Sequence, residues 1–160
     1  MIRQATAADA RAVALVHLET WRVAYAHAFP REALDDMSAE RVEARTEMHR
    51  RAPPLVAEQE GEIVGFVSVG SGLDPATDGE LYAIYVHPDH WGEGHGRDLI
   101  AAGEQRLREL GHEQAVLWVL EDNPRARRFY EAAGWTFDGS RRPIELLGVH
   151  VIEVRYEKRL

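Results

Sequence analysis

Apolar residues recur along this chain with two different periods, and the pattern predicts a mixture of helices and strands. Spacing of three to four positions over residues 13–24 predicts an amphipathic helix with a break near Thr20. Thr6 and Asp9 match a capping box at the start of this segment. A second helix is predicted over residues 38–51, where two consecutive prolines follow.

The remaining segments read as strands joined by turns and by two further helices. Glu60 and Gly61 predict a tight turn between two strands, and the pair Arg141–Arg142 is expected in a loop between the last two strands. The predicted strands cover residues 2–5, 55–58, 62–68, 80–86, 115–120, 135–138 and 150–156, and the later helices cover residues 97–110, with Leu110 on the apolar stripe, and 124–133. This order predicts an α+β fold with one strand–loop–helix–strand crossover in its centre.

Composition narrows the class of protein. A length of 160 residues fits a single domain over residues 1–160, and 45% hydrophobic with 29% charged residues is ordinary for a globular chain. The formal net charge of −8 argues against a general nucleic-acid binder. We expect no membrane span, no membrane partner and no secretory signal, because no apolar run has the required length. With no cysteine to form disulfides, a cytoplasmic location is the default expectation.

The most informative segment is V-H-P-D-H-W-G-E-G-H-G-R, residues 86–97, between a predicted strand and a predicted helix. Gly92, Gly94 and Gly96 allow positive φ and a close approach of the backbone to a ligand. The unpaired N–H groups at the start of the helix, together with Arg97, suit an anion such as phosphate. The segment matches neither a Walker loop, which needs a lysine, nor the G-x-G-x-x-G dinucleotide fingerprint.

A second segment, N-P-R-A-R-R-F-Y-E-A-A-G-W at residues 123–135, makes the pattern specific. The two segments together, with their spacing, resemble the acetyl-CoA loop and the N-x-x-A-x-x-F-Y-E-x-x-G signature of the GNAT family of N-acetyltransferases. This resemblance implies a three-layer α/β/α fold of the α+β class. Its central sheet is mixed and mostly antiparallel, with about seven strands and a V-shaped splay between the fourth and fifth.

The resemblance implies acetyl-CoA as the co-substrate, and no metal. Backbone groups of Ile84, Tyr85 and Val86 would pair with the pantetheine arm, and Asn123 would bind near the pantetheine or thioester end. The pyrophosphate would lie against the backbone amides of Gly92, Glu93, Gly94, His95, Gly96 and Arg97. One position departs from the family pattern, because Trp91 stands where Gln or Arg is frequent.

The implied reaction is direct transfer of the acetyl group to a primary amine. Tyr130 would be the general acid that protonates the leaving thiolate, and Glu80 is the first candidate for the general base. Glu80 can equally be a solvated carboxylate at the end of a strand, and His87 is a second candidate for the base. A catalytic Glu that some relatives carry on the following strand is replaced here by Trp118.

Several features keep more than one interpretation. His87, His90 and His95 have a spacing that can suggest zinc, but they lie in a loop. The aromatic residues Trp21, Tyr25 and Trp118 can line an acceptor pocket or simply pack in the core, and the arginines at positions 125, 127 and 128 can face solvent or the CoA 3′-phosphate. The acceptor, a small amine or a protein amine, stays open, as does a homodimeric state like that of many relatives. The alternative function is a non-catalytic acyl-CoA-binding module on the same fold.

Overall fold

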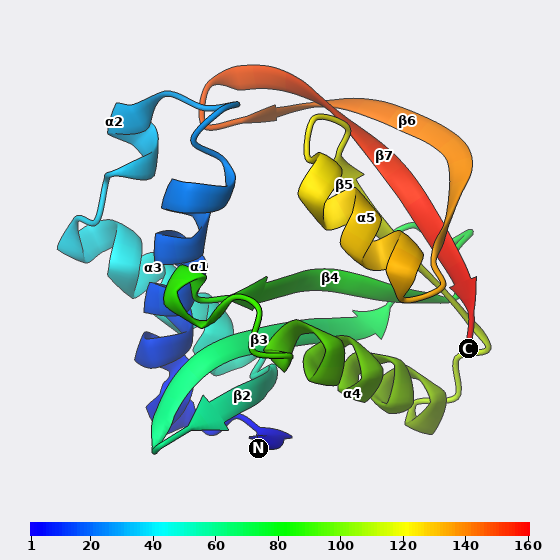
Figure 1. Ribbon diagram of the computed structural model, residues 1–160, viewed down its shortest axis with the longest axis horizontal. Coiled ribbons are helices and arrows are strands. Elements are labelled where there is room, and N and C mark those ends of the chain that lie inside the picture. Colours follow the sequence, from blue (N-terminus) through cyan, green and yellow to red (C-terminus); the bar gives the residue numbers. More distant parts are fainter. The chain divides into compact units, whose positions relative to one another are not determined.

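The computed structural model describes residues 1–160 as a seven-stranded sheet with flanking helices (Figure 1). The strand order is β1-β2-β3-β4-β5-β7-β6. The strands are β1 (Ile2–Gln4), β2 (Leu55–Gln59), β3 (Glu62–Ser71), β4 (Gly79–Val86), β5 (Gln114–Leu120), β6 (Thr136–Leu146) and β7 (Val149–Arg159). The helices are α1 (Ala10–Ala24), α2 (Arg31–Leu34), α3 (Ala39–Arg51), α4 (His95–Glu109) and α5 (Pro124–Ala132), with short 3₁₀ turns at Ala7–Asp9 and Pro88–His90. No helix combines the length and the apolar composition that a membrane crossing requires.

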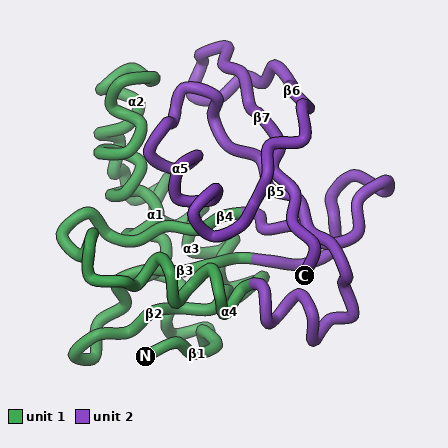
Figure 2. Tube along the Cα trace, turned by 45° about the vertical axis from the view of Figure 1, so that its right-hand side comes forward, with its two compact units in different colours: residues 1–68, 83–103 green, residues 69–82, 104–160 purple.

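The chain divides into two compact units, drawn in different colours in Figure 2. Unit 1 comprises residues 1–68 and 83–103, and unit 2 comprises residues 69–82 and 104–160. Strands β3 and β4 and helix α4 each contribute residues to both units. The two units are therefore described in turn.

Unit 1 has helices on both faces of its strands. On one face, Phe66 of β3 is fully buried in a cluster with Val13 and Val16 of α1. Its neighbour Gly65 points to the opposite face, where an added Cβ would lie 2.9 Å from Cδ1 of Leu99 in α4. Successive residues of a strand face opposite sides, so α1 and α4 cover opposite faces. The expected α/β/α layering is confirmed in this unit, and each fully buried apolar side chain contributes roughly 1.5–3 kcal/mol.

Two buried histidines complete the α1 side of this core. Nδ1 of His17 in α1 lies 3.1 Å from Nε2 of His49 in α3. Burial lowers the pKa of His49 to about 4 and lowers that of His17 well below its usual value. Both rings are therefore neutral near pH 7, and they pack against Phe66 as part of the core.

Unit 2 contains the parallel pair that the crossover predicts. Gly79 and Glu80 at the start of β4 pair with Ala115 and Val116 of β5, whereas β5–β7 and β7–β6 are antiparallel. The sheet is thus mixed and mostly antiparallel, as expected for the GNAT fold. The splay between β4 and β5 stays a prediction.

A largely buried ion pair connects β7 with the part of α4 that belongs to unit 2, and Trp135, the residue before β6, joins it. Lys158 of β7 donates to both carboxylate oxygens of Glu104 in α4 at 2.8 Å, and the indole N–H of Trp135 donates to the same carboxylate at 3.0 Å. Glu104 is only 6% exposed. Removing one partner of such a pair leaves an uncompensated buried charge, which typically costs about 3–5 kcal/mol.

Local sequence signals predicted most of the element ends correctly. The Thr6 N–H donates to the Asp9 carboxylate at 2.7 Å, as a capping box requires, and Ser38 Oγ accepts from the Arg41 N–H at 3.3 Å. The turn between β2 and β3 has positive φ at Glu60 and Gly61, the geometry of a two-residue hairpin turn.

The first helix differs from its prediction, because α1 runs without a break through Thr20. The Thr20 side chain is buried, and its hydroxyl donates to the Val86 carbonyl at 3.3 Å. This tertiary hydrogen bond satisfies the hydroxyl without interrupting the helix. The short helix α2 was not predicted, and Leu110, expected on the apolar stripe of α4, is 47% exposed beyond the helix end.

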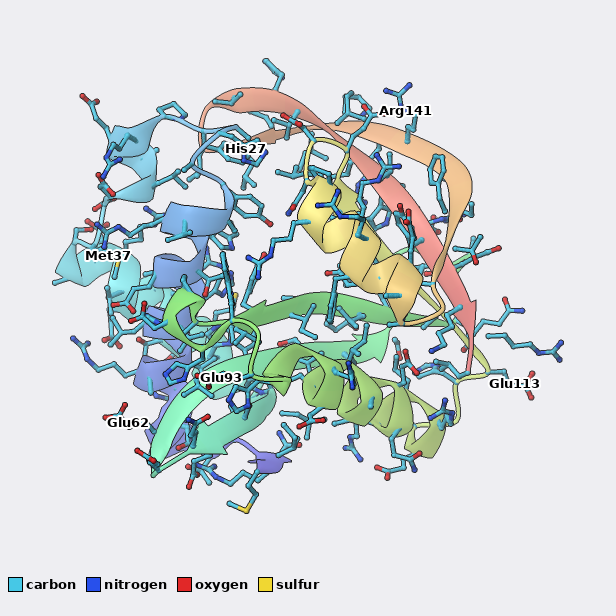
Figure 3. The ribbon with its side chains drawn as sticks, in the orientation of Figure 1. His27, Met37, Glu62, Glu93, Glu113 and Arg141 are labelled. Atoms are coloured by element: carbon cyan, nitrogen blue, oxygen red, sulfur yellow. The ribbon has the colours of Figure 1, made fainter.

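The predicted loop containing Arg141 and Arg142 is wrong, since both residues lie within β6, opposite Val154 and Glu153 of β7 (Arg141 is labelled in Figure 3). Pro143 weakened the strand signal there. A proline is tolerated at this position because β6 is the edge strand of the sheet, where an N–H group on the outer side needs no partner.

Candidate functional site

The glycine-rich loop of unit 1 leads directly into α4. Gly92 and Gly94 have φ of 86° and 94°, and an added Cβ at either would meet open space. Glycine is therefore required by backbone conformation rather than by crowding. Gly94 immediately precedes α4 and has no side chain that can cap the first-turn N–H groups. Gly96 lies inside α4 without positive φ, so only two of the three glycines adopt the left-handed conformation expected for the loop.

Trp91 ties this loop to the end of β4. Its indole N–H donates to the Val86 carbonyl at 2.7 Å, and that carbonyl also accepts from Thr20. The side chain that departs from the family pattern is thus used to hold the loop in place. The loop backbone is left to supply the N–H groups that an anion would bind.

Backbone geometry separates the three predicted pantetheine-binding residues of β4. The His87 N–H donates to the Val64 carbonyl of β3 at 2.8 Å, which identifies the edge of β4 that faces β3. Because backbone groups alternate along a strand, Tyr85 presents its N–H and carbonyl to that same edge. Ile84 and Val86 present theirs to the opposite edge. The Tyr85 ring packs 5.0 Å from that of His17 in the core.

The histidines of the loop do not gather as their spacing suggested. His87 Nε2 lies 2.7 Å from a Glu19 carboxylate oxygen of α1, and His87 Nδ1 accepts from the Asp89 N–H. The other two histidines converge on Glu93, with His90 Nδ1 at 3.1 Å and His95 Nε2 at 3.3 Å from Oε2. The hydrogen bond with His90, and then the neighbouring His95, lowers the pKa of Glu93. Glu93 is the member of this cluster that the histidine spacing missed.

The signature segment of unit 2 begins with a well-capped helix. Asn123 Oδ1 accepts from the Ala126 N–H at 3.2 Å, and Pro124 is the first residue of α5. The cap uses the side-chain oxygen of Asn123 and not its NH₂ group. Tyr130, on the same helix, is 8% exposed, and its ring centroid lies 6.3 Å from that of Tyr156 in β7. Tyr130 is more deeply buried than its neighbour Phe129.

Glu80 is buried, so its interpretation as a solvated strand-end carboxylate is wrong. It lies opposite Val116 in the parallel pair and is 6% exposed. Burial is the main cause that raises the pKa of Glu80, and the nearby carboxylates of Glu153 and Asp74 raise it further. A hydrogen bond from the Leu73 backbone N–H, and then the charge of Arg142, oppose this rise. A carboxylate with a raised pKa is a better proton acceptor than an exposed one.

Arginines of this chain cover the aromatic faces proposed for an acceptor. In unit 2, the Arg142 guanidinium lies 4.0 Å from the Trp118 ring centroid and pairs with Glu153 at 2.7 Å. In unit 1, Arg45 lies 5.4 Å from the Trp21 ring. Both are cation–π contacts within one unit.

The basic run on α5 is also partly used within the fold. The Arg127 Nε donates to the Tyr156 hydroxyl at 3.1 Å, and its Nη1 donates to the Glu121 carbonyl at 3.2 Å. Arg127 therefore fastens α5 to β7. It is not a solvated member of an open basic face.

Comparison with known sequences decides the family. Residues 15–135 match the sequence model of the Acetyltransferase (GNAT) family. The chain belongs to the GNAT family. An uncharacterized N-acetyltransferase of Bacillus subtilis, YuaI, is 33% identical over 134 residues, which span 82% of this chain and 77% of that protein. This GNAT chain is accordingly an acetyltransferase.

Other similar proteins are either matched over a smaller part of their own length or less identical to this chain in sequence. The mycothiol acetyltransferase of Sanguibacter keddieii is 43% identical over 86 residues, 51% of this chain but only 27% of that protein. The ribosomal-protein-alanine N-acetyltransferase of Brucella melitensis is a structural neighbour with a TM-score of 0.76 and 26% identity, covering 100% of this chain and 99% of its own. The protein yncA of Salmonella typhimurium, solved with its cofactor acetyl-CoA, has a TM-score of 0.74 at 22% identity over 99% of this chain and 92% of its own. This similarity supports the fold alone.

Proposed function

We propose that residues 1–160 act as one N-acetyltransferase domain that transfers the acetyl group of acetyl-CoA directly to a primary amine. The observation that carries the proposal is the loop of unit 1, in which two left-handed glycines lead into α4 with no capping side chain. Because the chain belongs to the GNAT family, we infer that the anion bound by this loop is the pyrophosphate of acetyl-CoA.

Each part of acetyl-CoA has a proposed set of partners. The backbone amides of residues 92–97 bind the pyrophosphate, at the positive end of the α4 dipole. Ile84 pairs with the pantetheine amides through its N–H and carbonyl, and Val86 through its N–H, since these groups lie on the edge of β4 away from β3. The Val86 carbonyl already accepts from Trp91 and Thr20. Asn123 donates its NH₂ group near the pantetheine or thioester end while its oxygen caps α5. The proposed transfer uses no metal.

The chemistry needs a proton acceptor and a proton donor. The amine nitrogen attacks the thioester carbonyl, a C–N bond forms and the C–S bond breaks. Glu80 takes the proton that the amine loses, directly or through a water, and the Tyr130 hydroxyl gives a proton to the departing thiolate. A backbone N–H near Val86 stabilises the oxyanion. The buried position of Glu80 and its raised pKa support the base assignment, and the role of Tyr130 rests on the signature segment.

The acceptor is proposed at the level of a chemical class. A primary amine is mostly protonated near neutral pH, because its usual pKa is about 10. The formal net charge of −8 favours the approach of such a cation. The proposal therefore covers cationic small amines and amines of proteins alike.

Calorimetric titration with acetyl-CoA, with ATP as the control, tests the proposal. We expect saturable binding of acetyl-CoA and none of ATP, followed by amine-dependent release of CoA thiol on an amine panel. The chain has no cysteine, so the thiol assay has no protein background. Absence of acetyl-CoA binding by the folded protein would refute the cofactor assignment. Tight binding without turnover on a broad panel would favour the non-catalytic module.

A further inference from the structure

We propose that His90, Glu93 and His95 form a binding site for a divalent transition-metal ion such as Zn²⁺ on the glycine-rich loop. The three side chains offer two imidazole nitrogens and one carboxylate oxygen, and these atoms all lie within 4.8 Å of one another. All three belong to unit 1 and to one short segment of chain. Figure 3 labels Glu93, which is the central member of the cluster.

The distances from Glu93 to the two histidines already suit a tetrahedral ion. Zn²⁺ binds nitrogen and oxygen ligands at about 2.0–2.2 Å, which places neighbouring ligand atoms about 3.3 Å apart. Oε2 of Glu93 lies 3.1 Å from His90 Nδ1 and 3.3 Å from His95 Nε2. An ion between these atoms therefore requires a small closing movement of the two histidines and no refolding of the loop.

A fourth donor lies beside the cluster. The amide oxygen of Gln59, at the end of β2, is 2.6 Å from the same nitrogen of His95. Nε2 of His95 donates the hydrogen of that bond, so binding an ion there requires this proton to leave Nε2 for Nδ1 or for solvent. The Gln59 oxygen is then within reach as an additional ligand. The Glu93 side chain is 45% exposed, so an ion can enter from solvent.

The neighbouring histidine does not belong to the site. His87 uses Nε2 toward Glu19 and Nδ1 toward the Asp89 N–H. Both of its ring nitrogens thus have partners within the fold. The structure replaces the three-histidine spacing of the sequence with a mixed histidine–carboxylate set, which suits divalent transition ions.

The site has a consequence for the cofactor, and this part rests on the proposed function. Glu93 lies between Gly92 and Gly94, in the segment whose amides are proposed to bind pyrophosphate, and its carboxylate repels that anion. A divalent ion cancels this charge and adds a positive one. Metal and acetyl-CoA should therefore strengthen each other's binding by the same factor.

The direct test is calorimetric titration of tag-free, metal-stripped protein with Zn²⁺ in a non-chelating buffer, without acetyl-CoA. We expect one ion per chain, and at least tenfold weaker binding in Glu93→Gln and in His90→Ala. The matched control is His150→Ala, which removes an exposed histidine 4.0 Å from another carboxylate, that of Glu145, and should leave the affinity unchanged. Circular dichroism of each variant checks that it is folded. Equal Zn²⁺ affinity in the wild type and Glu93→Gln would overturn the site.

The coupling is tested by titrating acetyl-CoA with and without saturating Zn²⁺. We expect several-fold tighter binding with the ion in the wild type and no such gain in Glu93→Gln, which also controls for complexes between Zn²⁺ and CoA in solution. Equal acetyl-CoA affinity with and without the ion would overturn the coupling. Zn²⁺ binding without acetyl-CoA binding would uphold the metal site and refute the proposed function. Acetyl-CoA binding without Zn²⁺ binding would uphold the cofactor assignment of the proposed function and refute the metal site.

Discussion

The two helices that follow the family motifs begin in opposite ways. In unit 2, the side chain of Asn123 caps α5 and Pro124 occupies its first position, so the first turn is largely satisfied from within. In unit 1, α4 follows Gly92 and Gly94, which both have left-handed φ. Gly94 lies directly before the helix and has no side chain that can cap it. Both helices meet the same physical problem of unpaired N–H groups.

The difference separates two tasks. A helix start that is capped by a side chain needs no external partner, which suits α5 as the carrier of Tyr130, the proposed general acid. A helix start that lacks a side-chain cap keeps donors for an external anion, which suits the proposed pyrophosphate site at α4. We therefore expect a change of Tyr130 on α5 to affect turnover more than cofactor affinity, and changes in the glycine loop to affect cofactor affinity first.

The largest expected effect comes from Tyr130→Phe. Loss of a general acid typically reduces the rate by 10²–10⁴-fold, so kcat should fall by about that factor. The acetyl-CoA dissociation constant should stay within about twofold, since the ring and its packing beside Tyr156 are kept. Steady-state kinetics and calorimetry measure the two quantities. An unchanged kcat would remove Tyr130 from the mechanism.

The next effect tests the glycine loop with a matched pair of variants. Gly94→Val forces a β-branched residue to a φ of 94°, which costs of order 1–3 kcal/mol, and should weaken acetyl-CoA binding about tenfold or more. Gly111→Val imposes the same strain at a φ of 91° just past the end of α4, also with open space around the Cβ. It should lower the melting temperature while leaving the affinity unchanged. Equal loss of affinity in both variants would show that strain acts through stability alone.

A smaller effect divides the two roles of Asn123. Asn123→Ala should destabilise the fold by about 1 kcal/mol through loss of the cap. Asn123→Asp keeps a capping oxygen but removes the NH₂ donor, so it should preserve the melting temperature and weaken acetyl-CoA binding several-fold. Thermal denaturation and calorimetry on both variants provide the comparison. Unaltered affinity in Asn123→Asp would restrict this residue to capping.

The smallest expected effect is a shift in the pH dependence of kcat/KM. Burial raises the pKa of Glu80, so the acid limb of kcat/KM should rise with pH through a value above that of an ordinary glutamate. Glu80→Gln should abolish that limb. The linked effect on the free energy of unfolding has the opposite pH dependence. The folded state binds the proton of Glu80 more tightly than the unfolded state does, so Glu80 contributes stability at low pH, and this stability is lost as pH rises through the raised pKa. An acid limb that persists in Glu80→Gln would assign the base to another group.

Prediction from sequence succeeded where the signal was local. Asn123 with Pro124, Ser38, and the Glu60–Gly61 turn each depend on residues within a few positions, and each has the expected structure. Prediction failed where a distant partner decided the outcome. The predicted break of α1 near Thr20 does not occur, because the Thr20 hydroxyl donates a hydrogen bond to the Val86 carbonyl, which is distant in the sequence.

The sequence by itself determined the order of elements and the two motifs, because these follow from periodicity and spacing along the chain. Its match to the GNAT family model determined the family, and the resemblance of the motifs to that family named the residues proposed for acetyl transfer. Only the tertiary structure decided the environment of those residues. It buried Glu80, placed the Trp91 indole on Val86 and brought Glu93 between two histidines. Burial and side-chain partners depend on which segments meet in space and on the direction of each side chain, and a linear pattern does not encode either one directly.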